Sequence, residues 1–116
     1  MRSNAEQVAS HLDRETLLIS AAKGLELNSN LRMSQVMAEA LGVPQSSVCV
    51  LSGPNLSNEV ARGLPSASVV ASQRNTLEGK ARHMLAGPSF FVQISEDVIG
   101  VELGGSLKNI IAVGAG

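Results

Sequence analysis

The sequence predicts an α/β fold in which helices cover a buried sheet. Short apolar runs, several of them β-branched, alternate with segments whose apolar residues recur three or four positions apart. Phe90 and Phe91 are the only aromatic residues, and a core of Val, Leu, Ile and Ala is typical of sheets covered on both faces. A chain of 116 residues is long enough for one such core. The later strands are close enough in sequence to allow some antiparallel pairing.

The first helix and the first strand are predicted within residues 1–22. Ser3 and Glu6 stand at the spacing of a capping box, and apolar residues follow at helical spacing as far as position 12. Residues 16–22 form a short, partly β-branched apolar run, which indicates a buried strand. Gly24 can adopt a positive φ and is expected to end this strand in a turn.

A second helix and a second strand follow. Asn30 is expected to cap a helix that carries one apolar stripe, and Gly42, with a proline two residues later, ends it. Residues 48–51 form the next strand, which runs into a turn at Gly53 and then into a short helix over residues 56–62. Gly53 is therefore placed at the carboxyl end of a strand.

Two strands and two helices are predicted in the rest of the chain. Residues 67–72 and 90–94 are strand-like runs, and between them residues 77–85 carry a helical stripe that stops before a Gly-Pro pair. Ser95 is expected to cap the last helix, with two acidic residues in its first turn, where the helix dipole favours them. The helical pattern then continues to Gly116.

Composition and charge argue against several kinds of function. The net charge of −1 and the scattered basic residues give no field that would attract nucleic acid. The single cysteine, Cys49, is interpreted as a buried side chain, and His11 and His83 have no partners at metal-ligand spacing. Residues 98–116 are the most apolar stretch, but the charged residues within it make a membrane span costly. Since no signal peptide pattern opens the chain, we expect a cytoplasmic protein.

The most informative segment surrounds Lys108. Residues three and four positions apart share a face of a helix, so Gly104, Gly105 and Ala112 would leave a hollow around this lysine. A lysine in such a desolvated hollow can exchange a proton with a substrate oxygen. The alternative is a lysine that extends to solvent from a closely packed pair of helices. Asn109 could orient a ligand or bond to a neighbouring carbonyl.

Two other positions lie where α/β sheets place their ligands, at the carboxyl ends of strands. Lys23 follows the first strand and Gly53 follows the second. A phosphate or nucleotide contact by Lys23 and an anion contact by the backbone around Gly53 are the functional interpretations. The alternatives are a solvated turn lysine and an ordinary strand-to-helix turn.

Four segments form an ordered series of blocks along the chain. They are residues 22–26 (Ala-Lys-Gly-Leu-Glu), 51–59 (Leu-Ser-Gly-Pro-Asn-Leu-Ser-Asn-Glu), 63–65 (Gly-Leu-Pro) and 98–116, which contains Gly-Gly-x-x-Lys-Asn. In order and spacing this series resembles the signature blocks of NAD(P)-dependent glycerol-3-phosphate dehydrogenases. The resemblance covers essentially the whole chain, and the combination of blocks is highly specific.

The resemblance implies reversible hydride transfer between NAD or NADP and dihydroxyacetone phosphate, which gives sn-glycerol 3-phosphate for glycerophospholipid synthesis. By position, Lys108 matches the proton-exchanging lysine, and Lys23 matches the lysine between dinucleotide and substrate. The substrate-side positions are Lys23, Gly53, Asn55, Lys108 and Asn109, and the dinucleotide-side positions are Lys23 and Ser57.

Two of these residues depart from the family pattern. Asn55 stands where Thr or Ser is frequent, and Ser57 stands where Ala is frequent. A backbone contact would survive either change, whereas a hydroxyl contact from position 55 would not.

The resemblance also divides the chain. Residues 1–95 are expected to be the second half of a Rossmann-type dinucleotide-binding sheet, and residues 96–116 the opening helix of an all-helical substrate domain. The family's glycine-rich pyrophosphate loop is expected to precede Met1, and most of the helical domain to follow Gly116. We therefore expect an internal piece of the enzyme that is inactive and poorly stable alone. The sequence leaves open whether NAD or NADP is preferred and whether the full-length protein forms a homodimer.

Two competing interpretations stay open as well. Related hydroxyacid dehydrogenases also place a lysine and an asparagine on a helix between domains, although the Ser-Gly-Pro-Asn block at residues 52–55 argues against them. A non-catalytic fragment that keeps family sequence is the other. A reading frame that continues on either side of these residues would distinguish part of a longer enzyme from such a fragment.

Overall fold

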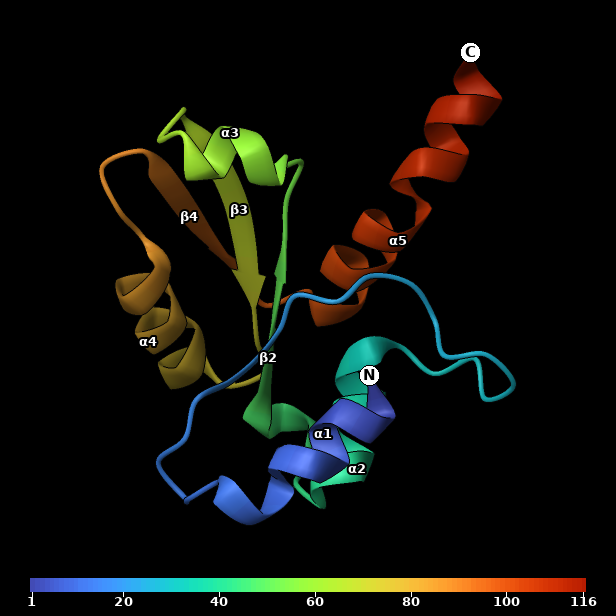
Figure 1. The fold of residues 1–116 in the computed structure, drawn as a ribbon, viewed down its shortest axis with the longest axis vertical. Helices are drawn as coiled ribbons and strands as arrows, with labels where there is room; N and C mark the ends of the chain where they lie inside the picture. Colours follow the sequence, from blue (N-terminus) through green and yellow to red (C-terminus); the bar gives the residue numbers. More distant parts are fainter.

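The described residues form four strands and five α-helices (Figure 1). The computed structural model describes residues 1–116, except for the side chain of Asn109. The strands are β1 (Leu18–Ser20), β2 (Val48–Ser52), β3 (Ser66–Ala71) and β4 (Phe90–Ser95). The helices are α1 (Arg2–Val8), α2 (Met33–Leu41), α3 (Ser57–Ala61), α4 (Asn75–Leu85) and α5 (Val98–Ala115), with short 3-10 helices at Ala9–His11 and Gln45–Ser47.

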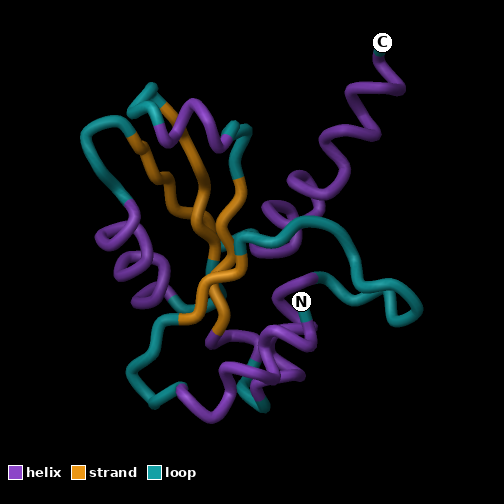
Figure 2. The backbone as a smooth tube through the Cα atoms, viewed as in Figure 1, coloured by secondary structure: helices purple, strands orange, loops and turns teal.

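The strands form one sheet in the order β1-β2-β3-β4 (Figure 2). β1 runs parallel to β2, and β3 runs parallel to β4. A parallel pair needs a crossover connection, and these crossovers contain α2 and α4. The antiparallel pairing that the sequence allows is found between β2 and β3, which are joined by the short segment that contains α3.

Helices cover both faces of the sheet, as the α/β prediction requires. α4 packs on one face, and α5 and α2 pack on the other, with α1 lying on α2 (Figure 1). Successive strand residues point to opposite faces, so Cys49 belongs to the core beneath α4 and Val50 to the core beneath α5. Cys49 is fully buried, in agreement with its interpretation as a core side chain.

Three predictions for the first half of the chain need correction. Ser3 lies inside α1, which begins at Arg2, so no capping box forms there. Asn30 adopts a φ of 57° in a turn before α2 and does not cap that helix, which begins at Met33. β1 is shorter than the run of residues 16–22, because β2 pairs with it only over Leu18–Ser20.

The cap of the last helix also differs from the prediction. Ser95 ends β4, and Asp97 caps α5, where its carboxylate accepts a hydrogen bond from the Gly100 N–H at 2.9 Å. An acid that was expected inside the first turn is thus the cap itself. α5 then runs along the sheet and extends beyond it (Figure 1). Among the helices of the described residues, none has both the length and the apolar character that crossing a membrane requires.

Candidate functional site

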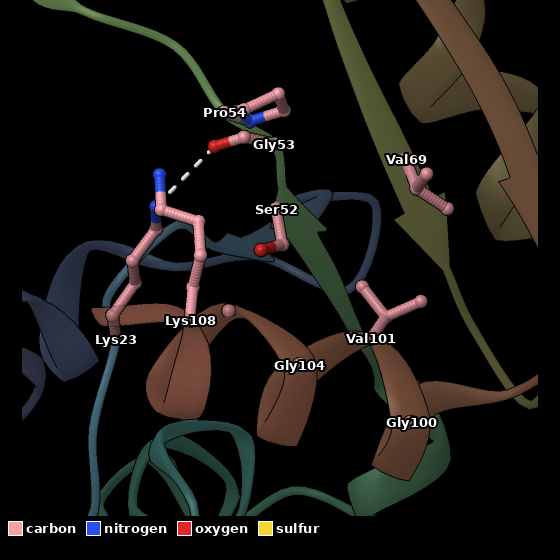
Figure 3. Close-up of a pocket in the computed structure, with 10 residues that line it drawn as sticks. Lys23, Ser52, Gly53, Pro54, Val69, Gly100, Val101, Gly104 and Lys108 are labelled. Carbon is pink, nitrogen blue, oxygen red and sulfur yellow. Dashed lines mark hydrogen bonds between the residues drawn. The ribbon is translucent and has the colours of Figure 1, made fainter. Parts of the chain in front are cut away.

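A pocket of about 230 Å³ lies where β1 and β2 end and α5 passes over the sheet (Figure 3). Because β1 and β2 are parallel, their carboxyl ends meet at this edge, which is where doubly wound sheets bind ligands. The walls are the turn after β1, the loop after β2, one residue of β3 and one side of α5. The lining residues are Lys23, Ser52, Gly53, Pro54, Val69, Gly100, Val101, Gly104, Gly105 and Lys108.

Lys23 reaches the pocket from the turn that follows β1. Gly24 has a φ of 95°, a conformation that L residues rarely adopt, so the chain turns sharply immediately after the lysine. The Gly24 N–H donates to the Ser106 hydroxyl on α5 at 2.9 Å. The Lys23 amine donates to the Gly53 carbonyl at 3.3 Å. Lys23 and Gly53, predicted at two strand ends, are therefore in direct contact.

Lys108 reaches the same pocket from α5, the helix that follows β4. The first residue of α5, Val98, packs in the core with Val50 and Ala71. The ten steps along the helix from Val98 to Lys108 correspond to a rise of about 15 Å. This rise carries Lys108 along the sheet to the edge where β2 ends, and in Figure 3 its side chain points towards the Gly53 carbonyl together with that of Lys23.

The two adjacent glycines of α5 have different local environments. A Cβ on Gly105 would collide with the Ser52 hydroxyl, so this glycine permits the close approach of α5 to the end of β2. A Cβ on Gly104 would meet nothing within 4 Å, so this glycine leaves open space in the pocket wall. Glycines on this face of α5 indicate a close neighbour. At Gly105 the neighbour is the end of β2, whereas the space beside Gly104 is open to a ligand.

The hollow around Lys108 differs from the predicted one in two respects. Ala112 is not among the residues that line the pocket, whereas Val101 and Ser52 are. Lys108 itself is exposed, so the described residues do not supply the desolvation that was expected around its amine. The lysine both lines the pocket and reaches solvent.

The pocket is positively charged. Lys23 and Lys108 both line it, and none of the lining residues that the structure describes is acidic. Two ammonium groups beside one cavity repel each other and attract an anion. The arrangement therefore favours a small ligand that carries a phosphate or a carboxylate.

Glu102 holds α5 in place from the side that faces α2. Its carboxylate is buried and pairs with the Arg32 guanidinium at 2.6 Å. It also accepts the Ser34 N–H at 2.9 Å and the Ser34 hydroxyl at 2.7 Å, so a side chain of α5 bonds to a free N–H in the first turn of α2. This role was missed from the sequence. The sequence does contain one hint of this role. Glu102 and Ser106 are four residues apart, so they form a polar face on an otherwise apolar helix, and such a face needs polar partners.

Two other predicted site residues, Asn55 and Ser57, are not among the residues that line this pocket. The Asn55 amide donates to the Ser68 hydroxyl, which leaves the side chain engaged within the protein. Ser57 is exposed at the first position of α3. The side chain of Asn109 lies outside the described residues. Gly53 is required where it stands, because a Cβ would lie 2.5 Å from the Ala67 carbonyl oxygen.

The thiol of Cys49 and the potential metal ligands among the described residues are poorly placed for chemistry. Burial raises the pKa of the Cys49 thiol, which disfavours the nucleophilic thiolate. Within the part of the chain that the structure describes, His, Cys, Asp and Glu side chains form no cluster that could hold a metal ion.

Comparison of the sequence with known proteins gives one consistent family. Residues 1–78 match the family described as NAD-dependent glycerol-3-phosphate dehydrogenase N-terminus. Over 100% of the chain, 46% of residues are identical to a glycerol-3-phosphate dehydrogenase [NAD(P)+] of Dehalococcoides mccartyi, of which the chain covers 33%. A chloroplastic glycerol-3-phosphate dehydrogenase [NAD(+)] of Oryza sativa subsp. japonica is 43% identical over 96% of the chain, which covers 25% of that protein.

Solved structures give the same picture. A glycerol-3-phosphate dehydrogenase of Coxiella burnetii superposes on 97% of the chain with a TM-score of 0.82 and 36% identity, and the chain covers 34% of it. The structure of a protein named DsGPDH from Dunaliella salina has a TM-score of 0.83 and 29% identity over 98% of the chain, which covers 20% of it. The chain thus spans about a third of the length of the bacterial relatives that it matches.

Proposed function

The chain belongs to the family of NAD-dependent glycerol-3-phosphate dehydrogenases, and on that premise we propose that its pocket binds the phosphorylated three-carbon substrate. The substrates would be dihydroxyacetone phosphate and sn-glycerol 3-phosphate, interconverted with NAD or NADP. The observation that carries the proposal is the convergence of Lys23 and Lys108 on one pocket beside the Gly53 carbonyl.

Charge and size both support this ligand. The two lysines attract a phosphate, and no described lining residue carries a negative charge that would oppose it. A volume of about 230 Å³ falls below the range of about 300 to 1,000 Å³ that is typical of sites for drug-sized molecules. The open space over Gly104 is where the carbon chain of a small metabolite would fit.

Lys108 would act at the reacting oxygen. In the reductive direction, carbon 2 of dihydroxyacetone phosphate gains a hydride, and its carbonyl oxygen takes a proton from the Lys108 ammonium. In the oxidative direction, the amine takes that proton back from the hydroxyl as the hydride leaves. A nicotinamide dinucleotide supplies or accepts the hydride when it is bound. Lys108 suits this role because its pocket is open both to a ligand and to the solvent that restores its proton.

Lys23 would lie between substrate and dinucleotide. Its amine stands at the pocket edge, and the glycine turn fixes its backbone. Gly53 would contribute a backbone contact on the substrate side, and Ser57 a contact to the dinucleotide. The Asn55 amide would act through the backbone around Gly53 rather than by direct contact, because it donates to Ser68. Asn109 would contact the substrate.

Several wider expectations rest on the same family. We propose that residues 1–95 belong to the dinucleotide-binding domain and that residues 96–116 open a helical substrate domain. We also propose a cytoplasmic protein that works in glycerophospholipid synthesis, with a homodimer as the assembly to test. Alone, the chain is expected to bind the phosphate ligand without turnover, since it spans about a third of its bacterial relatives.

The test uses the three lysines of the chain, Lys23, Lys80 and Lys108. Reductive methylation with isotope-labelled formaldehyde keeps their charge and gives each a separate methyl resonance. Titration with sn-glycerol 3-phosphate should move the resonances of Lys23 and Lys108. Lys80 lies on α4 outside the pocket and is the internal control.

Two comparisons make the result decisive. Glycerol, which lacks the phosphate, should move none of the three resonances. Lys108→Ala should weaken binding by about tenfold, as expected when a charged hydrogen-bonding partner is removed. Equal shifts at Lys80 would indicate general ion binding, and no shift at Lys23 or Lys108 at saturating ligand would contradict the proposed site.

A further inference from the structure

Ser106 connects the two segments that carry the pocket lysines. Its hydroxyl accepts the Gly24 N–H at 2.9 Å and donates to the Glu102 carbonyl, one helical turn earlier, at 2.9 Å. A serine hydroxyl can donate one hydrogen bond and accept others, so both functions are used here. The bonded N–H is one residue from Lys23, and the hydroxyl is two residues from Lys108.

The helix is anchored twice on the face beside the pocket. Glu102 and Ser106 are four residues apart and share a face of α5, whereas Gly104 and Lys108 share the neighbouring face that lines the pocket. Glu102 bonds to the start of α2, and Ser106 bonds to the turn after β1. Two anchors one turn apart fix both the rotation of the helix and its height along the sheet, and therefore the direction of Lys108.

The turn after β1 depends on this contact. Residues 21–23 are exposed, and Gly24 is half-buried. Among the residues that the structure describes, the bond from Gly24 to Ser106 is the one hydrogen bond between this turn and α5. Without it, little packing would hold the Lys23 backbone at a fixed distance from the helix.

We propose that Ser106 is a positioning residue that sets the distance between Lys23 and Lys108 and thereby tunes the affinity of the pocket for a phosphate. Ser106 does not itself line the pocket, so it would act through the two lysines. The effect of Ser106 on the distance between the two lysines does not depend on the proposed function. Its effect on phosphate affinity rests on that function.

The distance can be measured by cross-linking. Difluorodinitrobenzene joins amines that approach within the width of one benzene ring, and peptide mass spectrometry identifies the lysines joined. Ser106→Ala should lower the yield of the Lys23 to Lys108 cross-link by about threefold to tenfold, the range expected for the loss of one neutral hydrogen bond. Ser106→Thr keeps the hydroxyl, which can still bond to the carbonyl four residues earlier, and should restore the yield. Ser3→Ala, an exposed serine on α1, is the matched control.

A second measurement separates positioning from folding. Hydrogen exchange of the Gly24 amide should become faster in Ser106→Ala and return to the original rate in Ser106→Thr, while core amides such as that of Val70 keep theirs. Ser106→Cys offers a milder change, since a thiol keeps the shape but bonds weakly. It should give an intermediate cross-link yield. If folded Ser106→Ala gives the original cross-link yield and the original Gly24 exchange rate, the positioning role is wrong.

Measuring ligand affinity distinguishes the positioning role of Ser106 from the proposed function of the pocket. With sn-glycerol 3-phosphate as the probe, Ser106→Ala should weaken binding at the Lys23 and Lys108 methyl groups by a similar factor, and Ser106→Thr should recover it. If the original chain binds no phosphate but its cross-link still depends on Ser106, the proposed function fails and the effect on the distance stands. If the chain binds phosphate equally with and without the hydroxyl, the proposed function stands and the tuning role is overturned.

Discussion

The two halves of α5 have similar apolar sequences but different surroundings. In the first half, up to Ser106, Val98 is 5% exposed and the charged Glu102 is 9% exposed. In the second half, Ile110 is 68% exposed and Val113 is 82% exposed. A glutamate is therefore buried in the same helix in which an isoleucine faces solvent.

This difference shows that the place of a residue along the sheet and around the helix, rather than side-chain polarity alone, decides what α5 buries; Ile99, on another face of the first half, is 50% exposed. The first half lies over β2 and β3, and there Glu102 finds Arg32 and Ser34 as partners. The second half extends past the end of the sheet, as Figure 1 shows. Apolar side chains without a packing surface form an exposed patch of the kind found at interaction sites. Lys108 stands at the boundary between the two halves.

The largest expected effect comes from the lysine at this boundary. In a full-length enzyme that carries this chain, Lys108→Ala should lower turnover by about 10² to 10⁴-fold, the usual contribution of a positioned proton donor. Nicotinamide affinity should change little. Steady-state kinetics with dihydroxyacetone phosphate measures turnover, and direct titration measures nicotinamide affinity. Lys80→Ala on α4 is the control, and near-normal turnover of a folded Lys108→Ala enzyme would remove the catalytic role.

Removing Glu102 tests how the first half is anchored. Glu102→Ala leaves the Arg32 guanidinium and the Ser34 N–H without their partner and should cost about 3 kcal/mol in the free energy of unfolding. Urea denaturation measures the loss. Glu96→Ala removes an exposed acid just before the helix and should change the free energy by less than about 0.5 kcal/mol. Equal stabilities of the two variants would mean that apolar packing alone holds this half.

Paired changes in apolar residues compare the halves directly. Val98→Ala in the first half should cost about 2 kcal/mol, because it opens a cavity in the core under α5. The double change of Ile110 and Ile111 to Gln in the second half should alter the free energy of unfolding by less than about 0.5 kcal/mol. A large loss of stability in the double variant would show that the second half is packed in solution.

The glycines of α5 sharpen the comparison further. An alanine in place of a helical glycine gains about 0.5 to 1 kcal/mol where nothing obstructs the methyl group. Gly104→Ala should show this gain but weaken binding of sn-glycerol 3-phosphate, because the methyl enters the pocket. Gly105→Ala should gain less, because it collides with the Ser52 hydroxyl. Gly114→Ala, in the last turn, should leave binding unchanged. Thermal melting and the lysine methyl titration measure both effects.

The smallest effect is expected far from α5, at Arg2. Hydrogen bonding to Arg2, and then to Ser29, lowers the pKa of Glu26 to about 2. A carboxyl group with a lowered pKa in the folded state contributes stability above its ordinary value of 4.5 and loses that contribution as the pH falls towards 2. The stability difference between the original chain and Arg2→Ala should therefore shrink as the pH falls through this window. A difference that stays constant with pH would point to packing of the Arg2 side chain instead.

Much of the fold follows from local patterns in the sequence. Helical spacing and β-branched runs predict the four strands and the helices α1, α2, α4 and α5, because those patterns report which side of an element is buried, and the turn residues on either side of residues 56–62 predict α3. Helix starts were harder to predict. The start of α2 is held locally by the Gln35 side chain, which accepts the Arg32 N–H at 3.0 Å. It is also held by Glu102, which is 68 residues from Ser34, and no local pattern contains that second contact. Asp97 replaced Ser95 as a cap because both residue types can cap and only the end of β4 selects between them.

The candidate site was predictable where it depends on topology. Lys23 and Gly53 follow neighbouring parallel strands, and the strand-end rule brings such positions together. Lys108 could be placed from its glycine neighbours and from the family resemblance. The exposure of its amine and the contact between Ser106 and Gly24 depend on how α5 crosses the sheet, which the sequence pattern does not contain.

The reversal of direction between β2 and β3 has a consequence for how the chain opens. β2 and β3 pair antiparallel, so the sheet consists of two parallel β-α-β units that meet at a seam of three residue pairs. Cooperative opening units often coincide with such supersecondary motifs, and the amides of the two units are expected to exchange with solvent as separate groups. Ser52 and Val69, which pair across the seam, both line the pocket. A bound ligand would then slow exchange on both sides at once, because it binds only while the seam is closed.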